Sequence, residues 1–488
     1  MRKHHVLLTS LLALGACSSP PAPTKSGGLA VDQTRQRFGG LDPLILPPGV
    51  RERFVAIAAA LRPHVHSTVN VYRSPGVAPA PAMPDPAPAP APLGKLDWNM
   101  SFASGVDTTP ALFIPNYPML SDADDRLYAV VNTGSGWVAR SYYNLYKPAD
   151  APPDVCGETP LAGSVDNSFI TLSLDGQTFY VATANGFMYA IPNLATCSDV
   201  PTTVTPRWVH STGKSFVHTG FWVDFATNLL YIGDTSGNLY AMDGDSGTAI
   251  AGFPRLLTAS ALHTFPVVWN GVVWLGNDAG QLLRVDATSG AVLSTTNLCP
   301  GTCGADDAVY ATPWFDMGRE VVIAAANQRM FELSPLGAIT ATLPFLTGHP
   351  GAVWSSPSVD LDSTPPFAYV GFDNQLFKIA YPITAGSTIL SQPTVGTGDV
   401  THPRSSPTLF NGNLFIGDGG GFMDRFVLDG STTVFAAPAA SPQYGSSIDT
   451  TCVIDYLTYD STTLSTGNIY FGASGSASGN LVQITRAY

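Results

Sequence analysis

One segment of the sequence recurs 43 positions farther along the chain, and this repeat constrains the fold more than any other feature. Residues 228–247 (NLLYIGDTSGNLYAMDGDSG) align without a gap to residues 271–290 (GVVWLGNDAGQLLRVDATSG). The alignment places Gly233 opposite Gly276. A fixed period of this size is typical of repeat architectures, in which each unit is covered by its neighbours.

Each unit has the pattern of two short β-strands joined by a turn. In the first copy, the apolar run 229–232 has the length of a strand that is buried on both faces. Asp234 and Gly237 then supply a turn, because Asp bonds nearby backbone amides and Gly accepts a positive φ. A second run at 239–242 returns as the hairpin partner. The unit is therefore predicted to be a small antiparallel sheet.

The pattern of the returning strand recurs along the whole second part of the chain. Its markers are Trp137, Phe187, Leu239, Leu282, Met330, Leu376, Phe422 and Leu481. Their intervals lie close to the roughly 40–50 residues of a four-stranded blade. We predict an all-β fold, in which residues 95–488 form an eight-bladed β-propeller of four-stranded antiparallel blades. The segment Asp97–Phe102 is expected to pair with residues 481–484 and to complete the last blade.

The strand upstream of several hairpins begins at a proline, where no ladder donor is lost. These sites are Thr109-Pro110, Phe265-Pro266, Thr312-Pro313, Ser356-Pro357 and Ser406-Pro407. Residues 228–247 and 405–426 resemble the repeats of the PQQ-like (quinoprotein) propeller superfamily. That superfamily includes the quinoprotein alcohol dehydrogenases and the outer-membrane assembly lipoprotein BamB. The hairpin at residues 172–181 is closer to those of YVTN and TolB-like propellers.

The resemblance implies PQQ chemistry only where the cofactor residues of the family are present. Those enzymes use a Trp floor, a Ca²⁺ held by acidic and amide side chains, a catalytic Asp and, in most cases, adjacent cysteines. This sequence has no adjacent cysteines, and its four Glu residues lie outside any matching motif. We therefore predict no cofactor, no metal and no catalytic residue. A PQQ-dependent dehydrogenase stays as the less favoured alternative.

The first sixteen residues have the pattern of a lipoprotein signal peptide. Arg2 and Lys3 precede an apolar run, 6–16, that is too short for a permanent transmembrane helix. The run ends in Leu-Gly-Ala-Cys17, which resembles a bacterial lipobox and implies cleavage before Cys17 and acylation (palmitate) of that cysteine. An ordinary secretory signal with a chance cysteine is the alternative. Ser18 in the next position implies sorting to the outer membrane, on its periplasmic face or at the cell surface.

Two further segments precede the repeats. Residues 17–75 are predicted to form a polar tether with one short helix at 51–61, where the apolar residues follow helical spacing. Residues 76–94 are dominated by Ala and Pro, which predicts a semi-rigid extended linker.

Charge and cysteine content exclude several classes of partner. The chain has a net charge of −13 and no basic cluster, which argues against nucleic acid. Acidic groups at residues 122–125, 243–245 and 360–362 lack the Asp-x-Asp-x-Asp-Gly loop with a distal Glu, so turn capping explains them better than calcium.

In an exported protein we expect disulfides Cys156–Cys197 and Cys299–Cys303, with Cys452 left over. A metal site at the second pair lacks two further ligands.

One aligned position carries large polar and aromatic side chains. It lies three residues before the proline and is occupied by Asp107, His263, Tyr310, Trp354 and Arg404; weaker alignments add Asp166, His218 and Tyr444. We expect these side chains on one rim of the channel, where such residues suit recognition of a partner. The alternative is that they plug and solvate the channel mouth.

Together these observations favour a non-catalytic, lipid-anchored propeller scaffold. Its expected partners are other envelope proteins, in outer-membrane assembly or at the cell surface, and the membrane through the N-terminal lipid. A carbohydrate- or small-ligand-binding propeller, which could be an enzyme, is the alternative.

Overall fold

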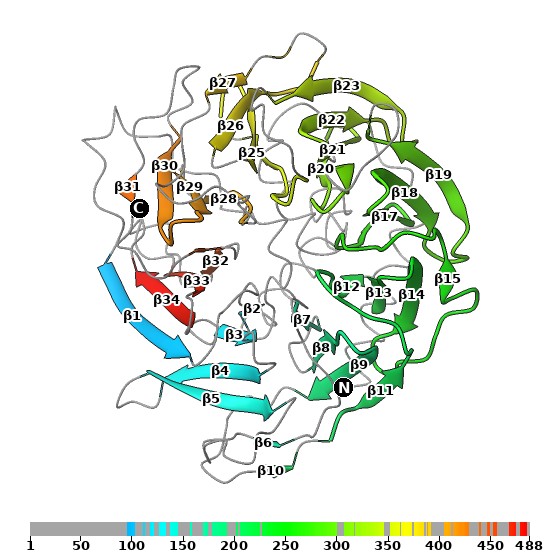
Figure 1. Cartoon of the computed structure of the whole chain (residues 1–488), viewed down its shortest axis with the longest axis vertical. Helices are drawn as coiled ribbons and strands as arrows, with labels where there is room; N and C mark the ends of the chain where they lie inside the picture. Colours follow the sequence, from blue (N-terminus) through cyan, green and yellow to red (C-terminus); the bar gives the residue numbers. More distant parts are fainter. Residues whose placement is uncertain are drawn as a thin grey trace, which may run out of the picture.

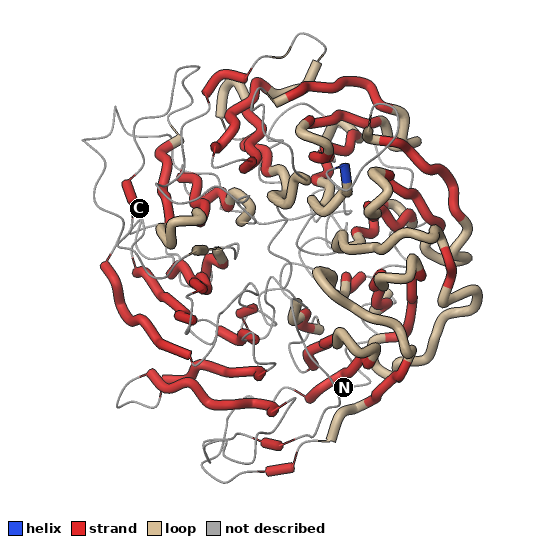
Figure 2. The backbone as a smooth tube through the Cα atoms, in the orientation of Figure 1, coloured by secondary structure: helices blue, strands red, loops and turns tan. Residues whose placement is uncertain are grey.

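The computed structural model shows antiparallel sheets arranged one after another around a common axis (Figures 1 and 2). The structure describes residues 95–102, 111–112, 118–121, 126–132, 137–144, 157–158, 169–173, 178–192, 202–203, 205–224, 227–299, 307–316, 318–345, 352–361, 363–372, 375–384, 387, 389–391, 405–410, 413–428, 439–440, 447–448, 452–455, 468–474 and 479–485. The tether helix expected at 51–61 and the linker at 76–94 lie outside these residues.

The described strands form four-stranded antiparallel sheets. From the innermost strand outward, the first sheets are β2 (Ala111–Leu112), β3 (Pro118–Ser121), β4 (Arg126–Asn132) and β5 (Trp137–Asn144); β7 (Thr171–Leu172), β8 (Thr178–Ala182), β9 (Phe187–Pro192) and β11 (Trp208–Ser211); β12 (Trp222–Asp224), β13 (Leu229–Gly233), β14 (Asn238–Asp243) and β15 (Arg255–Leu256); and β16 (Val267–Trp269), β17 (Val272–Gly276), β18 (Gln281–Asp286) and β19 (Val292–Asn297).

The sheets that follow are β20 (Trp314–Asp316), β21 (Val321–Ala326), β22 (Arg329–Leu333) and β23 (Ile339–Pro344); β24 (Ser358–Asp360), β25 (Phe367–Phe372), β26 (Gln375–Ala380) and β27 (Ile389–Ser391); β28 (Thr408–Phe410), β29 (Asn413–Gly417), β30 (Met423–Val427) and β31 (Ala439–Ala440); and β32 (Val453–Asp455), β33 (Asn468–Ser474), β34 (Gly479–Thr485) and β1 (Lys95–Phe102). Strands β6 (Gly157–Glu158) and β10 (Thr202–Thr203) pair in parallel as a separate sheet. The prediction of an all-β fold of antiparallel four-stranded sheets is confirmed.

Strand β1 comes from the first part of the described chain but belongs to the last sheet. It pairs antiparallel with β34, from Lys95 opposite Thr485 to Phe102 opposite Gly479. Figure 1 shows β1 as the outer strand beside β34. This confirms the expected pairing of Asp97–Phe102, and it covers an edge of β34 that would otherwise be open.

The prediction is wrong for one of the strand markers. Trp137 lies in β5, the outermost strand of its sheet, whereas Leu239 and the other markers lie in the third strand or directly before it. The hairpin at Trp137 is therefore formed by strands three and four. The local pattern of two apolar runs joined by a turn is the same for either hairpin, so sequence alone could not distinguish them.

The proline sites mark the beginning of innermost strands, as predicted. Strands β16, β20, β24 and β28 each begin directly after the proline. The hydroxyl residue before the proline bonds to the neighbouring sheet. The backbone N–H of Thr312 donates to Ser356 Oγ at 2.9 Å, and that of Ser356 donates to Ser406 Oγ at 2.9 Å. A hydroxyl at this position thus joins one sheet to the next near the axis.

The second strands β13, β17 and β29 end in glycine, and the next sheet packs directly against that position. A Cβ added to Gly233 would lie 2.6 Å from Leu262 Cβ, and one added to Gly276 would lie 2.5 Å from Val309 Cβ. Leu262 and Val309 are fully buried and precede the innermost strand of the following sheet. The aligned glycines of the repeat are therefore contacts between sheets, where a side chain does not fit.

Farther from the axis, long polar side chains reach from one sheet to a turn of the next. Tyr180 Oη donates to the carbonyl of Gly244 at 3.2 Å, and Tyr231 Oη donates to that of Ala287 at 3.0 Å. In the next sheet Arg284 takes this role, since its Nη1 donates to the carbonyl of Leu336 at 3.0 Å. Apolar side chains fill the space between these contacts and the axis.

The turn that joins the second and third strands is organised by a buried carboxylate or amide. Asp234 accepts hydrogen bonds from the backbone of Ser236 and Asn238, from Asn238 Nδ2 and from Tyr240 Oη, at 2.8–3.0 Å. Asp418, at the same place in another sheet, accepts backbone bonds through Oδ1, while its buried Oδ2 has no hydrogen-bond partner. Burial raises the pKa of the Asp418 carboxyl, against the lowering effect of its backbone bonds.

The glycine contact between sheets yields a first prediction. Gly276→Ala should lower the free energy of unfolding by about 1–3 kcal/mol, because the new methyl group overlaps Val309 and the backbone must move. Gly318→Ala is the matched control, since its methyl group would meet only Asp316 Oδ1, at 3.4 Å. Urea unfolding of both variants measures the difference. Equal midpoints would contradict a tight contact at Gly276.

Asp418 yields a prediction about pH. Because burial raises its pKa in the folded chain, the folded state binds this proton more tightly than the unfolded state does. Stability from this group is therefore greatest below the unfolded-state pKa and falls as pH rises through the folded one. Asp418→Asn should be at least as stable as the wild type at pH 7. The difference in unfolding free energy between the variant and the wild type should shrink as the pH falls toward 4.

The control for this pH effect is the same change at Asp234. There the charged carboxylate accepts four hydrogen bonds, so Asp234→Asn should lower stability at pH 7 by about 1–3 kcal/mol. Denaturant unfolding at several pH values measures both variants. An equal loss of stability in Asp418→Asn and Asp234→Asn at pH 7 would contradict the prediction, because it would show that the folded chain stabilises the Asp418 charge.

Candidate functional site

Four of the side chains predicted for the channel rim come together in the structure. His218, His263, Tyr310 and Trp354 lie in the segments that lead into β12, β16, β20 and β24, the innermost strands of four consecutive sheets (Figure 1). Their rings contact one another, and we call these four residues the axial cluster. The other rim candidates, Asp107, Asp166, Arg404 and Tyr444, lie outside the described residues.

The four rings form a closed chain of contacts. Tyr310 and Trp354 are stacked, with centroids 3.9 Å apart and an angle of 15° between the planes. His218 meets Trp354 at 5.1 Å and His263 at 5.8 Å, both in T-shaped geometry. His263 meets Tyr310 at 5.7 Å and completes the chain. Stacked and edge-to-face pairs are the favourable arrangements of aromatic rings, so each ring helps to orient two others.

The contact between His218 and Trp354 places the cluster at the axis of the ring. His218 belongs to the sheet of β12 and Trp354 to the sheet of β24, and two other sheets separate them along the chain. In a ring of sheets, such distant members meet only at the centre. His218 also has φ 54°, an uncommon value for a residue with a side chain. Its ring is therefore held toward Trp354 by a specific backbone conformation.

An acidic residue orients one of the histidines. His263 Nδ1 lies 3.0 Å from Asp278 Oδ1, in the turn between β17 and β18. With a neutral imidazole, Nδ1–H donates to the carboxylate and Nε2 is left as an acceptor. The side chains of His263 and Asp278 are 16% and 34% exposed, so the pair is accessible to a ligand.

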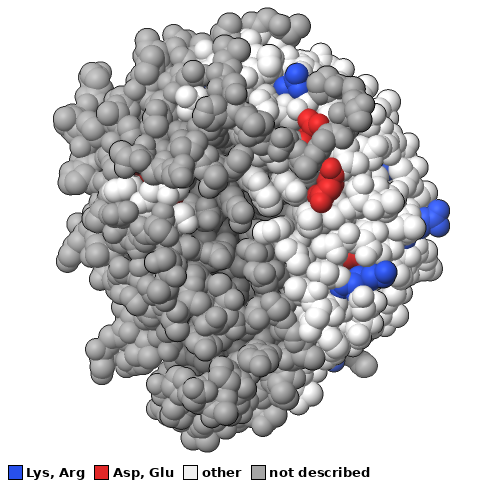
Figure 3. Space-filling model, viewed as in Figure 1, with Lys and Arg blue, Asp and Glu red and all other residues white. Residues whose placement is uncertain are grey.

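The face of the molecule seen along the axis carries little charge in its described part. Figure 3 shows only scattered Lys, Arg, Asp and Glu residues there, and uncharged residues cover most of the surface.

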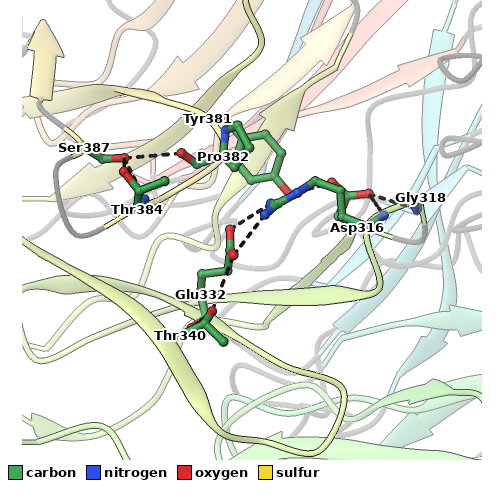
Figure 4. Close-up of polar contacts among 9 residues, drawn as sticks. Asp316, Gly318, Glu332, Thr340, Tyr381, Pro382, Thr384 and Ser387 are labelled. Atoms are coloured by element: carbon green, nitrogen blue, oxygen red, sulfur yellow. Dashed lines mark hydrogen bonds and ion pairs between the residues drawn. The ribbon is translucent and has the colours of Figure 1, made fainter.

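A second polar cluster lies between the sheets of β20 and β24 (Figure 4). Arg319 forms a bidentate pair with Glu332 at 2.8 and 3.0 Å, and its guanidinium lies 5.1 Å from the Tyr381 ring centroid. Tyr381 Oη donates to Asp316 Oδ2 at 2.6 Å, and burial followed by the Asp316 charge raises the Tyr381 pKa. These groups bond to one another and so join the two sheets.

Sequence reasoning missed this second cluster. Its members lie on three separate strands and loops, and no motif links them in sequence. The one available signal was Glu332, an acidic residue at a position of β22 that faces the interior. A buried acid predicts a basic partner, but it does not say which one.

The acidic turns at 243–245 and 360–362 behave as caps, and the group at 122–125 lies outside the described residues. Asp243 Oδ1 accepts from the backbone and hydroxyl of Ser246 at 2.8 Å, and Asp286 does the same for Ser289. In the described part of the chain, no group of three or more His, Cys, Asp or Glu residues could hold a metal ion.

Two of the cysteines lie within the described residues. Cys299 is disulfide-bonded, whereas Cys452 is buried and takes no part in a disulfide. Cys156, Cys197 and Cys303 lie outside the described residues, so both pairings stay predictions.

None of the helices within the described residues has the length and apolar character needed to cross a bilayer.

Comparison with known proteins shows similarity of fold. No family model matches the sequence, and no curated protein matches it. BamB from Moraxella catarrhalis is a structural match at 12% identity and TM-score 0.50, covering 80% of this chain and 97% of that one. Quinohemoprotein alcohol dehydrogenase from Comamonas testosteroni matches at 11% identity and TM-score 0.52, covering 80% and 76%.

A third match is a yeast protein. Sqt1 from Saccharomyces cerevisiae matches at 9% identity and TM-score 0.56, covering 80% of this chain and 99% of that one. At such low identities the matches show the fold alone. The chain has a β-propeller fold.

The axial cluster yields a prediction about energetic coupling. Tyr310→Ala, Trp354→Ala and the double variant should show a coupling energy of about 0.5–1.5 kcal/mol in denaturant unfolding, because the rings are stacked. Tyr180 is the control partner for Trp354, since it lies in a different sheet and packs elsewhere. A Tyr310–Trp354 coupling no larger than the Tyr180–Trp354 coupling would contradict the stack.

Proposed function

We propose that this chain is a non-catalytic, lipid-anchored β-propeller scaffold that binds another protein of the bacterial envelope. Each four-stranded sheet is one of eight blades, and acylated Cys17 holds the chain at the outer membrane. The partner belongs to outer-membrane assembly or to the cell surface. The observation that carries the proposal is the meeting of His218, His263, Tyr310 and Trp354 at the axis.

The chemistry of the axial cluster supports a recognition role. Trp and Tyr are enriched among the residues that dominate binding energy at protein interfaces. Trp354 and Tyr310 are partly exposed, and their rings are already fixed by neighbours. A fixed ring loses little conformational freedom on binding, so more of its contact energy appears as affinity. The structural likeness to BamB supports the fold, and the scaffold role follows by analogy.

The same cluster also supports a second candidate, a receptor for a small neutral ligand such as a carbohydrate. The stacked rings of Tyr310 and Trp354 adjoin a hydrogen-bonding His263 oriented by Asp278. Ligand sites combine apolar or aromatic surfaces with a few placed polar groups in this way.

A photo-crosslinking experiment in the native cells tests the scaffold proposal. We would place p-benzoylphenylalanine at Ala259, an exposed residue in the segment that leads to His263. The probe should link the full chain to one envelope protein, and His218→Ala with Trp354→Ala should reduce that yield strongly. Truncating residues of this kind costs about 2 kcal/mol or more at an interface. The same probe at Val209, on the outer strand β11, is the control.

The outcomes separate the candidates. An unchanged yield in the double variant would contradict docking at the axial cluster. Loss of any protein adduct, together with saccharide-dependent changes in tryptophan fluorescence that vanish in Trp354→Ala, would replace the scaffold with the ligand receptor. Cys17→Ser should move the chain out of the outer-membrane fraction, since acyl chains would be its anchor.

A further inference from the structure

The outermost strands of the sheets differ greatly in length and in protection. Strand β15 has two residues, β27 three and β11 four, whereas β19 and β23 have six each. Neither β19 (VLSTTN) nor β23 (ITATLP) contains a charged residue. Exposed edge strands of natural proteins are normally kept short or carry charges that prevent pairing with other chains. These two edges lack both forms of protection.

Exposed apolar side chains gather on these two strands and on the turn that precedes β23. We call Val292, Leu293, Leu336 and Ile339 the outer belt; they are 42%, 47%, 76% and 40% exposed. Thr296 Oγ1 in β19 donates to the carbonyl of Gly337 at 2.6 Å, so the turn before β23 lies against β19. Figure 1 shows both strands on the outer circumference of the ring. The outer belt is therefore one continuous surface and not a set of isolated residues.

The edge of β19 determines what kind of group can cover it. An outermost strand presents backbone N–H and C=O groups, and an extended strand satisfies both. An antiparallel pair of identical strands is two-fold symmetric, so β19 can pair with itself. Each copy has a net charge of −13, which opposes contact between copies except where the surface is uncharged. The strands β19 and β23 provide such a surface.

We propose that β19 pairs antiparallel with β19 of a second copy of this chain. The sheet of β16–β19 would then continue through both molecules, and the outer belt of each copy would be covered. This interface is separate from the axial cluster, so a dimer leaves the proposed partner site open.

Disulfide crosslinking of the full chain in its native envelope tests the pairing. Cysteine would be introduced singly at Leu293, Thr295 and Asn297, and oxidised cells would be examined on non-reducing gels. Because identical residues face each other only at the two-fold axis, the yield of dimer should peak at one position and fall on either side. The controls are the unsubstituted chain and Thr205→Cys, an exposed residue before β11. Both should run as monomers on the non-reducing gel, because neither has a cysteine introduced in β19.

A charge on the edge provides the second variant. A lysine two residues from the best-linking cysteine (Thr295→Lys beside Leu293→Cys or Asn297→Cys, and Leu293→Lys beside Thr295→Cys) should lower the dimer yield by about tenfold, because it places like charges in the two paired strands. Positions 293 and 295 are exposed, so thermal unfolding should not change. Absence of dimer at all three positions, a yield equal to that of Thr205→Cys, or crosslinks to a different protein would each overturn the proposal.

Discussion

The close contact between the end of one second strand and the segment leading into the next sheet determines the rest of this structure. Leu262 and Val309 fit against Gly233 and Gly276, where a side chain would not fit. The residues directly after them are His263 and Tyr310. The contact that fixes the spacing of the sheets therefore also fixes the point from which each ring extends toward the axis. Packing between sheets and geometry of the candidate site are two consequences of one arrangement.

Much of this arrangement could be predicted from the sequence because it is encoded locally and repeated. The glycines align between copies, the prolines mark the first residues of innermost strands, and the position before β16, β20 and β24 carries His263, Tyr310 and Trp354. His218 follows only from a weaker alignment, since Phe221 stands where the other units have proline.

The parts that sequence could not supply depend on contacts between distant elements. The hairpin at Trp137 has the same local pattern as its counterparts, and only sheet order shows that it includes the outer strand. The group of Asp316, Arg319, Glu332 and Tyr381 joins two sheets through side chains with no common motif. That His218 reaches Trp354 across two intervening sheets depends on the diameter of the ring, which no single unit encodes.

Rings from non-adjacent sheets meet at the axis, and NMR of ¹³C-labelled histidine side chains tests this meeting most directly. Aromatic neighbours shift the imidazole resonances, so Trp354→Phe and Trp354→Ala should progressively displace the signal of His218, which His218→Gln would assign. His210, which packs on Trp208 in another sheet, should not move. A large shift is expected at His218 and none at His210. An unmoved His218 signal would contradict the axial cluster.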